Sequence, residues 1–330
     1  MRAFISGCQG LRLGEEERAF LRDADPWGLI LFKRNVESRE QLRALTSEFR
    51  ALVGRDAPVL IDQEGGRVQR LAPPLWPAYP AAARFDAELD PQRAEAAARL
   101  TMRLIAHDLR EVGINVDCAP VLDVADEATH AVIGTRAYGR DPARVAILAR
   151  AAMAGLLVGG VAPVIKHIPG HGRARADSHL ELPVVEATLT ELERDFSAFR
   201  VLKDAPAAMT AHVVYTAIDR ERPATTSAKV LSEIVRGDIG FDGLLISDDL
   251  SMKALGGPFE ARTRAVFAAG CDIALHCNGD LVEGRPVAEA TPPLEGRARK
   301  RAEALLAAPH VEDFDVAEGR ARLAEMFAAA

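Results

Sequence analysis

Cysteine is scarce in this chain, and long apolar runs are missing. Four cysteines occur among 330 residues, and they form neither a CxxC pair nor a zinc-ligand spacing. They are Cys8, Cys118, Cys271 and Cys277. We therefore expect reduced, mostly buried thiols and no structural zinc site. No apolar run approaches the roughly 18 residues that a membrane-spanning helix needs.

An excess of positive charge is missing as well. The net charge of −7 argues against a binder of nucleic-acid backbones, which needs clustered Lys and Arg. The stretch "ISGCQG" resembles a lipoprotein cleavage site at Cys8, but only three apolar residues, Ala3–Ile5, precede Ser6. A secretory signal needs an apolar core of about 7–15 residues. We therefore expect a cytoplasmic protein that binds neither membranes nor nucleic acid.

Short apolar runs alternate with helix-like segments along the whole chain. One helix-like segment, "TLTELERDFSAFRVLKD", has a capping signature, because Thr188 or Thr190 stands before acidic residues. Eight runs are expected to be strands: Ala3–Ser6, Gly28–Phe32, Pro58–Ile61, Ile114–Ala119, Ala162–Lys166, Ala207–Ala211, Gly243–Ser247 and Cys271–His276. This pattern predicts an α/β fold in which a parallel sheet closes into a (β/α)8 TIM-type barrel. An open doubly wound sheet is the alternative, but no GxGxxG follows the first strand. No linker divides the chain, so residues 1–330 are expected to form one catalytic barrel domain.

Polar side chains follow nearly every predicted strand. They are Lys33, Arg34, Asn35, Asp62, Glu64, Asp117, Asp123, Lys166, His167, His212, Asp248, Asp249 and Asn278. In a barrel enzyme the chemistry gathers at the carboxyl ends of the strands. A purely structural sequence has no reason to place ionisable groups there, so the distribution indicates an enzyme.

The stretch "KHIPGHGRARADSHLELP" allows two chemistries, metal binding and proton transfer. His167 and His171 are four residues apart, but Pro169 and Gly170 lie between them and prevent a helical i, i+4 pair. The first strand also offers no HxH pair of the kind found in barrel zinc hydrolases. A metal-dependent hydrolase therefore remains the less favoured alternative.

The proton-transfer interpretation rests on Asp177 and His179, which flank Ser178. A carboxylate that accepts from one imidazole nitrogen orients the ring, so that the other nitrogen can exchange a proton near neutral pH. Asp248 closes the seventh strand and could act as a nucleophile, a base or a metal ligand. Capping of the next helix fits Asp249 equally well, and alternation along the strand does not choose between the two.

Three blocks in order, "IDQEGGRVQRL" (61–71), "KHIPGHGRARADSH" (166–179) and "ISDDLSM" (246–252), resemble glycoside hydrolase family 3. Among its members they are most similar to single-domain bacterial β-N-acetylhexosaminidases. The resemblance implies that Asp248 is the nucleophile and that His179, paired with Asp177, is the acid/base. It implies sugar-binding roles for Asp62, Arg70, Arg136, Lys166 and His167. It implies no metal and no other cofactor.

The same resemblance implies exo-hydrolysis of a terminal β-linked N-acetylglucosamine, with retention of configuration. The implied substrate is N-acetylglucosaminyl-1,6-anhydro-N-acetylmuramic acid, with or without its peptide, released during cell-wall recycling. A phosphorylase that uses the same histidine is an alternative, because phosphate in place of water leaves little sequence trace. We expect a monomer, and the sequence leaves the preference between N-acetylglucosamine and N-acetylgalactosamine open.

Overall fold

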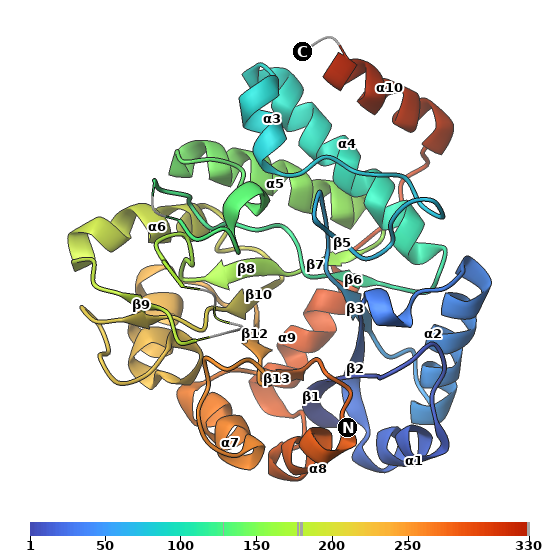
Figure 1. Cartoon of the computed structure of the whole chain (residues 1–330), viewed down its shortest axis with the longest axis vertical. Helices are drawn as coiled ribbons and strands as arrows, with labels where there is room; N and C mark the ends of the chain where they lie inside the picture. Colours follow the sequence, from blue (N-terminus) through green and yellow to red (C-terminus); the bar gives the residue numbers. More distant parts are fainter. Residues whose placement is uncertain (128, 177, 179–180, 329–330) are drawn as a thin grey trace.

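The computed structural model describes residues 1–127, 129–176, 178 and 181–328, and a ring of parallel strands forms its centre (Figure 1). The strands are β1 (Arg2–Gly7), β2 (Pro26–Leu31), β3 (Val59–Ile61), β6 (Val116–Asp117), β7 (Ala162–Pro163), β8 (Ile165–Ile168), β10 (Ala207–Thr210), β12 (Leu244–Asp249) and β13 (Ile273–His276). Only Val164 separates β7 from β8, so the two are halves of one strand.

The ring closes through this divided strand. Its first half, β7, pairs with β6, and its second half, β8, pairs with β10. At the opposite point of the ring, β1 pairs with both β2 and β13. Every pairing in this sheet is parallel. The predicted eight-stranded barrel is therefore confirmed, with one helix-bearing connection after each strand.

Helices surround the ring. They are α1 (Glu15–Ala24), α2 (Arg39–Val53), α3 (Ala83–Glu88), α4 (Pro91–Arg110), α5 (Pro142–Val158), α6 (Leu189–Val201), the π-helix η4 (Val230–Asp238), α7 (Phe259–Ala269), α8 (Leu281–Ala290), α9 (Gly296–Ala307) and α10 (Val316–Ala328). The predicted cap of α6 lies at Thr188. Its hydroxyl accepts from the Glu191 amide at 3.3 Å, and the Glu191 carboxylate accepts from the Thr188 amide at 2.8 Å. Each helix in the described ranges is too short or too polar to span a lipid bilayer.

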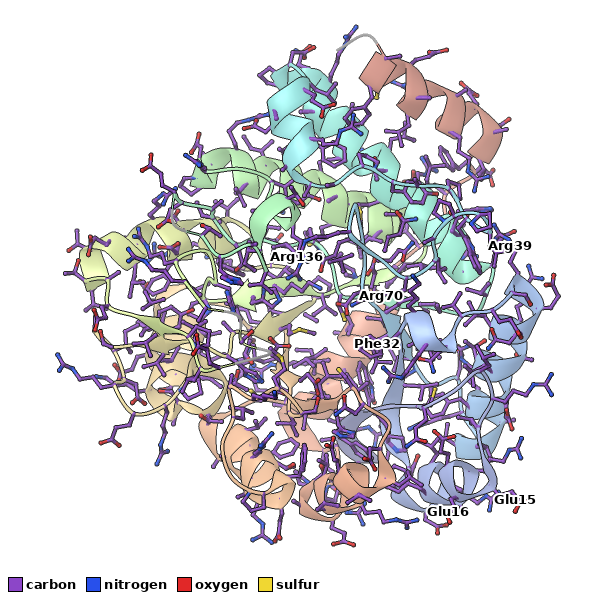
Figure 2. All side chains as sticks on the ribbon, viewed as in Figure 1. Glu15, Glu16, Phe32, Arg39, Arg70 and Arg136 are labelled. Carbon is purple, nitrogen blue, oxygen red and sulfur yellow. The ribbon has the colours of Figure 1, made fainter. Side chains whose placement is uncertain are left out.

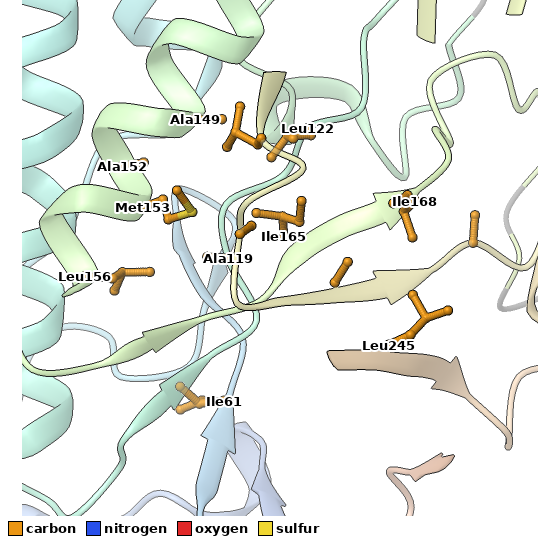
Figure 3. Packing of buried hydrophobic residues seen from close by; sticks show 14 of the residues in the cluster. Ile61, Ala119, Leu122, Ala149, Ala152, Met153, Leu156, Ile165, Ile168 and Leu245 are labelled. Atoms are coloured by element: carbon orange, nitrogen blue, oxygen red, sulfur yellow. The ribbon is translucent and has the colours of Figure 1, made fainter. Parts of the chain in front are cut away.

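Two apolar layers follow from the alternation of side chains along each strand. Ile5 of β1 and Ile246 of β12 belong to the cluster that fills the barrel interior, and Leu305 of α9 closes that cluster at the amino-terminal end of the strands. Phe4 belongs to the second cluster, which lies between the strands and the outer helices. In this outer layer Met153 and its neighbours on α5 face the strands (Figure 3).

Loops at the carboxyl ends of the strands carry small elements of their own. β4 (Gln63–Gly65) and β5 (Val68–Gln69) form an antiparallel hairpin directly after β3. β9 (Val184–Val185) pairs with β11 (Val214–Tyr215), and this pairing joins the loops that follow β8 and β10. Short 3-10 turns, η1 (Lys33–Asn35), η2 (Gly134–Arg136) and η3 (Ala224–Thr226), complete this end of the barrel.

Candidate active site

A cavity of about 420 Å³ opens at the carboxyl ends of the strands. Six of the predicted site residues line it together, although they come from distant parts of the chain: Asp62, Arg70, Arg136, Lys166, His167 and Asp248. Figure 2 shows Arg70 and Arg136 near the centre of the ring, with Phe32 close to Arg70, whereas Glu15 and Glu16 lie at the periphery on α1. The expected gathering of polar groups at one end of the barrel is therefore present.

A network of alternating charges forms one wall of this cavity. The Lys166 ammonium lies 2.7 Å from Asp62 Oδ1 and 2.6 Å from Glu64 Oε1. Glu64 also accepts two hydrogen bonds from the Arg136 guanidinium, at 2.8 and 2.7 Å. Arg70 Nη2 lies 3.3 Å from Asp62 Oδ2. Each of the two carboxylates is thus paired with two cations, as charges withdrawn from water must be.

These contacts keep Asp62, Glu64 and Lys166 charged. Burial would raise the pKa of Glu64, but Arg136 and Lys166 lower it to about 2. Burial would likewise raise the pKa of Asp62, yet Lys166 and Arg70 hold it well below its usual range. The pKa of Lys166 rises although burial opposes this, because both carboxylates favour the ammonium. Near neutral pH the wall therefore offers ionised carboxylate oxygens as acceptors and fixed N–H donors, which suits a polyhydroxylated ligand.

His167 lines the cavity and is held from behind by Asp123, which is fully buried. His167 Nδ1 lies 2.7 Å from Asp123 Oδ2, and the other carboxylate oxygen accepts from the backbone amide of His171 at 2.6 Å. Burial would raise the pKa of Asp123, but His167 lowers it to about 2. Asp123 is therefore an ionised acceptor.

His171 also lines the cavity, and its Nδ1 is buried without a hydrogen-bond partner in the described part of the chain. Burial is the main cause that lowers the pKa of His171 to about 4. The ring is neutral near neutral pH. The ring centroids of His167 and His171 are 5.6 Å apart. His167 lies in β8 and His171 in the loop after it, so the two do not form a helical i, i+4 pair.

The two aspartates at the end of β12 have different surroundings. Asp248 follows Ile246 by two residues, on the interior face, and lines the cavity. Asp249 Oδ1 accepts from the amides of Ser251 and Cys277, each at 3.0 Å, and its carbonyl oxygen lies 2.9 Å from His212 Nε2. Although Asp249 also borders the cavity, its carboxylate is engaged in holding the strand end.

The predicted dyad residues Asp177 and His179 lie outside the described residues. Ser178, between them, lines the same cavity as Asp248. Its carbonyl oxygen accepts from the amide of Ala254, in the loop after β12, at 3.2 Å. Ser178 is thus placed beside the loop that follows β12.

Three residues of the site had no assigned role from the sequence: Glu64, Asp123 and His171. Asp123 follows β6, which pairs with the divided strand β7–β8. Glu64 follows β3, which is the next strand along the ring. A carboxylate after each of these two strands, close to Lys166, is the sequence feature that could have identified both residues. For His171 the sequence carries no comparable signal, because its burial depends on how the loop after β8 folds.

Among the described residues, one group could offer three ligand atoms to a metal ion: His107, Asp108 and Glu111, at the carboxyl-terminal end of α4. It lies outside the barrel cavity. Asp108 already accepts from the Tyr79 hydroxyl at 2.6 Å and from Arg320 at 2.8 Å. Two strong donors thus occupy the only buried carboxylate of this group.

Comparison with known proteins agrees with this geometry. Residues 5–299 match the profile described as "Glycosyl hydrolase family 3 N terminal domain". The Beta-hexosaminidase of Bordetella avium is 40% identical over 325 residues, which cover 95% of this chain and 90% of that protein. The Beta-hexosaminidase of Alkalilimnicola ehrlichii is 43% identical over 283 residues, covering 83% and 80%.

Solved structures give the same result. NagZ from Neisseria gonorrhoeae, in complex with N-trifluoroacetyl-D-glucosamine, superposes with a TM-score of 0.85 at 37% identity, covering 98% of this chain and 97% of that one. A family 3 β-N-acetylglucosaminidase from Paenibacillus gives a TM-score of 0.87 at 28% identity, covering 98% and 67%. The barrel, the charged cavity at its mouth and these matches together show that the chain belongs to glycosyl hydrolase family 3 and is a glycoside hydrolase.

Proposed function

We propose that this glycoside hydrolase is an exo-acting, retaining β-N-acetylglucosaminidase. The curated relatives are named Beta-hexosaminidase, and the Neisseria gonorrhoeae structure contains an N-acylated glucosamine derivative. One observation carries the proposal: Asp248 and Ser178 line a single cavity together with the charged wall of Asp62 and Lys166. This arrangement supports a carboxylate nucleophile, a neighbouring acid/base loop and a sugar-binding surface in one site.

Asp248 is the proposed nucleophile. Its carboxylate attacks the anomeric carbon and forms a glycosyl ester, while the bond to the leaving oxygen breaks. His179, oriented by Asp177, donates a proton to that oxygen. The neutral imidazole then takes a proton from water, whose oxygen attacks the anomeric carbon and releases Asp248. Two displacements restore the β configuration, and one imidazole serves both proton transfers.

The charged wall is proposed to bind the sugar. Ionised Asp62 accepts hydrogen bonds from two hydroxyl groups, and Lys166 and Arg70 hold that carboxylate in place while they offset its charge. Arg136 is fixed by Glu64 and supplies a donor at the edge of the cavity. His167 contributes its second ring nitrogen.

The proposed cellular substrate is N-acetylglucosaminyl-1,6-anhydro-N-acetylmuramic acid, with or without peptide, in cell-wall recycling. The proposal includes one catalytic domain over residues 1–330, a monomeric state and a cytoplasmic location. Light scattering on the purified chain tests the monomer, and fractionation of the producing cells tests the location. Adding phosphate to the assay separates a hydrolase from a phosphorylase, because only a phosphorylase releases the sugar 1-phosphate.

The roles of Asp248 and His179 are tested with an aryl N-acetyl-β-glucosaminide. We expect Asp248→Asn to lower kcat by at least about 10⁴-fold, because no nucleophile remains. His179→Ala should lower kcat/KM by about 10²–10⁴-fold for an alkyl glycoside, and much less for a nitrophenyl glycoside that leaves without protonation.

Asp280→Asn is the matched control. Asp280 caps α8 by accepting from the Val282 amide, and Asn caps a helix equally well, so this variant should keep wild-type rates. Substantial turnover by folded Asp248→Asn would overturn the assignment of the nucleophile. An equal loss for both leaving groups in His179→Ala would overturn that of the acid.

A further inference from the structure

Asp123 is a buried carboxylate, and its partners among the described residues all belong to the segment that leads from β8 into the following loop. It is 0% exposed and does not line the cavity. It accepts from the His167 ring at 2.7 Å, from the His167 amide at 3.3 Å and from the His171 amide at 2.6 Å. All three groups are N–H donors toward Asp123, so the carboxylate is surrounded by donors from one segment.

The contact with the ring decides which nitrogen of His167 carries the proton. An ionised carboxylate accepts only, so Nδ1 must be protonated to make the 2.7 Å hydrogen bond. When the ring carries this single proton, its lone pair is on Nε2. Nε2 makes no hydrogen bond within the described part of the chain, while the ring borders the cavity. His167 Nε2 therefore presents a hydrogen-bond acceptor to the cavity.

The amide contacts fix the backbone from which the same loop departs. Gly172 follows His171 and lies so close to the backbone after Asp123 that an added Cβ would be 1.9 Å from the carbonyl oxygen of Val124. The Thr129 hydroxyl donates to the Gly172 carbonyl at 2.7 Å, and the Tyr215 hydroxyl donates to the Gly170 carbonyl at 2.6 Å. Asp123 thus lies at the centre of a fixed loop base.

We propose that Asp123 is a positioning residue that sets the tautomer of His167, so that Nε2 accepts a hydrogen bond from a hydroxyl group of the bound sugar. Asp123 acts through His167 and does not touch the substrate. The sugar contact rests on the proposed function, whereas the tautomer does not.

Asp123→Asn tests this role because an amide cannot accept on both sides. If the Asn oxygen faces the backbone amides, its NH₂ group faces the ring, and His167 Nδ1 must become the acceptor. The proton then moves to Nε2, which turns toward the cavity as a donor. If the NH₂ group faces the backbone amides of His167 and His171 instead, N–H donors point at each other and the amides lose their acceptor.

The direct measurement is the ¹⁵N shift of the ring nitrogens in the histidine-labelled full chain, with His167→Gln used to assign the signal. We expect a protonated Nδ1 and an unprotonated Nε2 in the wild type, and the reverse pattern or a mixture in Asp123→Asn. A wild-type His167 protonated at Nε2 alone would overturn the proposal without any variant having to fold.

Kinetics on the aryl N-acetyl-β-glucosaminide supply the second test. Asp123→Asn should raise KM and lower kcat/KM by about 10–100-fold, the scale of one lost hydrogen bond to a charged or polar ligand group. In a His167→Ala background, the same substitution should change kcat/KM by less than about threefold, because residues that act through each other are not additive. If Asp123→Asn lowered kcat/KM by the same factor in the His167→Ala background as in the wild type, the proposal would be contradicted.

Asp108→Asn is the matched control. Asp108 is 1% exposed and holds Tyr79 and Arg320 far from the cavity, so its loss should affect unfolding but neither the His167 shifts nor KM. If wild-type protein lacks the proposed hydrolase activity yet shows the expected tautomer, the proposed function fails while the role of Asp123 in setting the tautomer stands.

Discussion

Individual side chains at the barrel mouth differ in how they tolerate burial. Lys166 and Glu64 stay charged because oppositely charged atoms lie within 2.8 Å of both. Among the described residues, His171 Nδ1 has no such partner, and the ring avoids the cost of burial by staying neutral. One site thus contains both solutions to the burial of an ionisable group.

His171 makes the stability of the fold depend on pH. Its pKa falls from 6.5 to about 4 in the folded chain, so the unfolded chain binds the proton more readily. The free energy of unfolding should therefore be highest above pH 6.5 and fall by about 3 kcal/mol toward pH 4.

Urea titrations at several pH values check this contribution. In His171→Gln the decrease between pH 6.5 and 4 should be smaller, whereas exposed His310→Gln should leave it unchanged. Identical pH slopes for wild type and His171→Gln would show that His171 is not the responsible group.

At this scale the sequence predicted the residues that stand directly beside a strand end. Asp62, Lys166 and Asp248 could be placed at the barrel mouth because a strand of parallel sheet delivers its last side chains there. The partner of His167 could not be predicted. Asp123 lies 44 residues away, and its contact depends on the path of a loop whose backbone follows no repeating pattern.

In the proposed mechanism, catalysis depends most on the loop after β8. Its base is packed against the loop after β6, since Gly172 leaves no room for a side chain beside Val124. We expect Gly172→Ala to displace this base and to lower kcat/KM by about 100-fold, the cost of misplacing a catalytic group by about 1 Å.

Gly256→Ala provides the comparison, because an added Cβ there would meet no atom within 4 Å. It lies in the loop after β12 and should keep activity within about twofold of the wild type, as surface substitutions usually do. Equal rates for Gly172→Ala and wild type, measured at matched folded fractions, would show that the loop base tolerates displacement.

Elements with a repeating pattern were predicted well. The cap of α6 was expected at Thr188 or Thr190, and the structure shows that Thr188 forms it. The break of the fifth strand at Val164 into β7 and β8 was not anticipated, because each half pairs with a different neighbour and the sequence shows only one apolar run.

Closure of the barrel explains how residues from positions 62 to 248 share one cavity. Eight apolar runs with intervening helices were enough to predict this, since few other parallel folds contain that number of strands.

The charged wall within the cavity leads to an expectation for metal removal. Lys166 and Arg136 already occupy the carboxylates of Asp62 and Glu64, so activity should survive prolonged dialysis against EDTA. Loss of turnover that zinc restores would favour the metal-dependent alternative.

Asp248 is expected to form a covalent bond to the sugar. A fluorinated N-acetylglucosamine derivative with a good leaving group should trap this ester, and peptide mapping of the labelled chain should then locate it. We expect one sugar per chain, attached to Asp248, and no labelling of Asp248→Asn. A label on another residue, or an inactivated enzyme that carries no label, would contradict it.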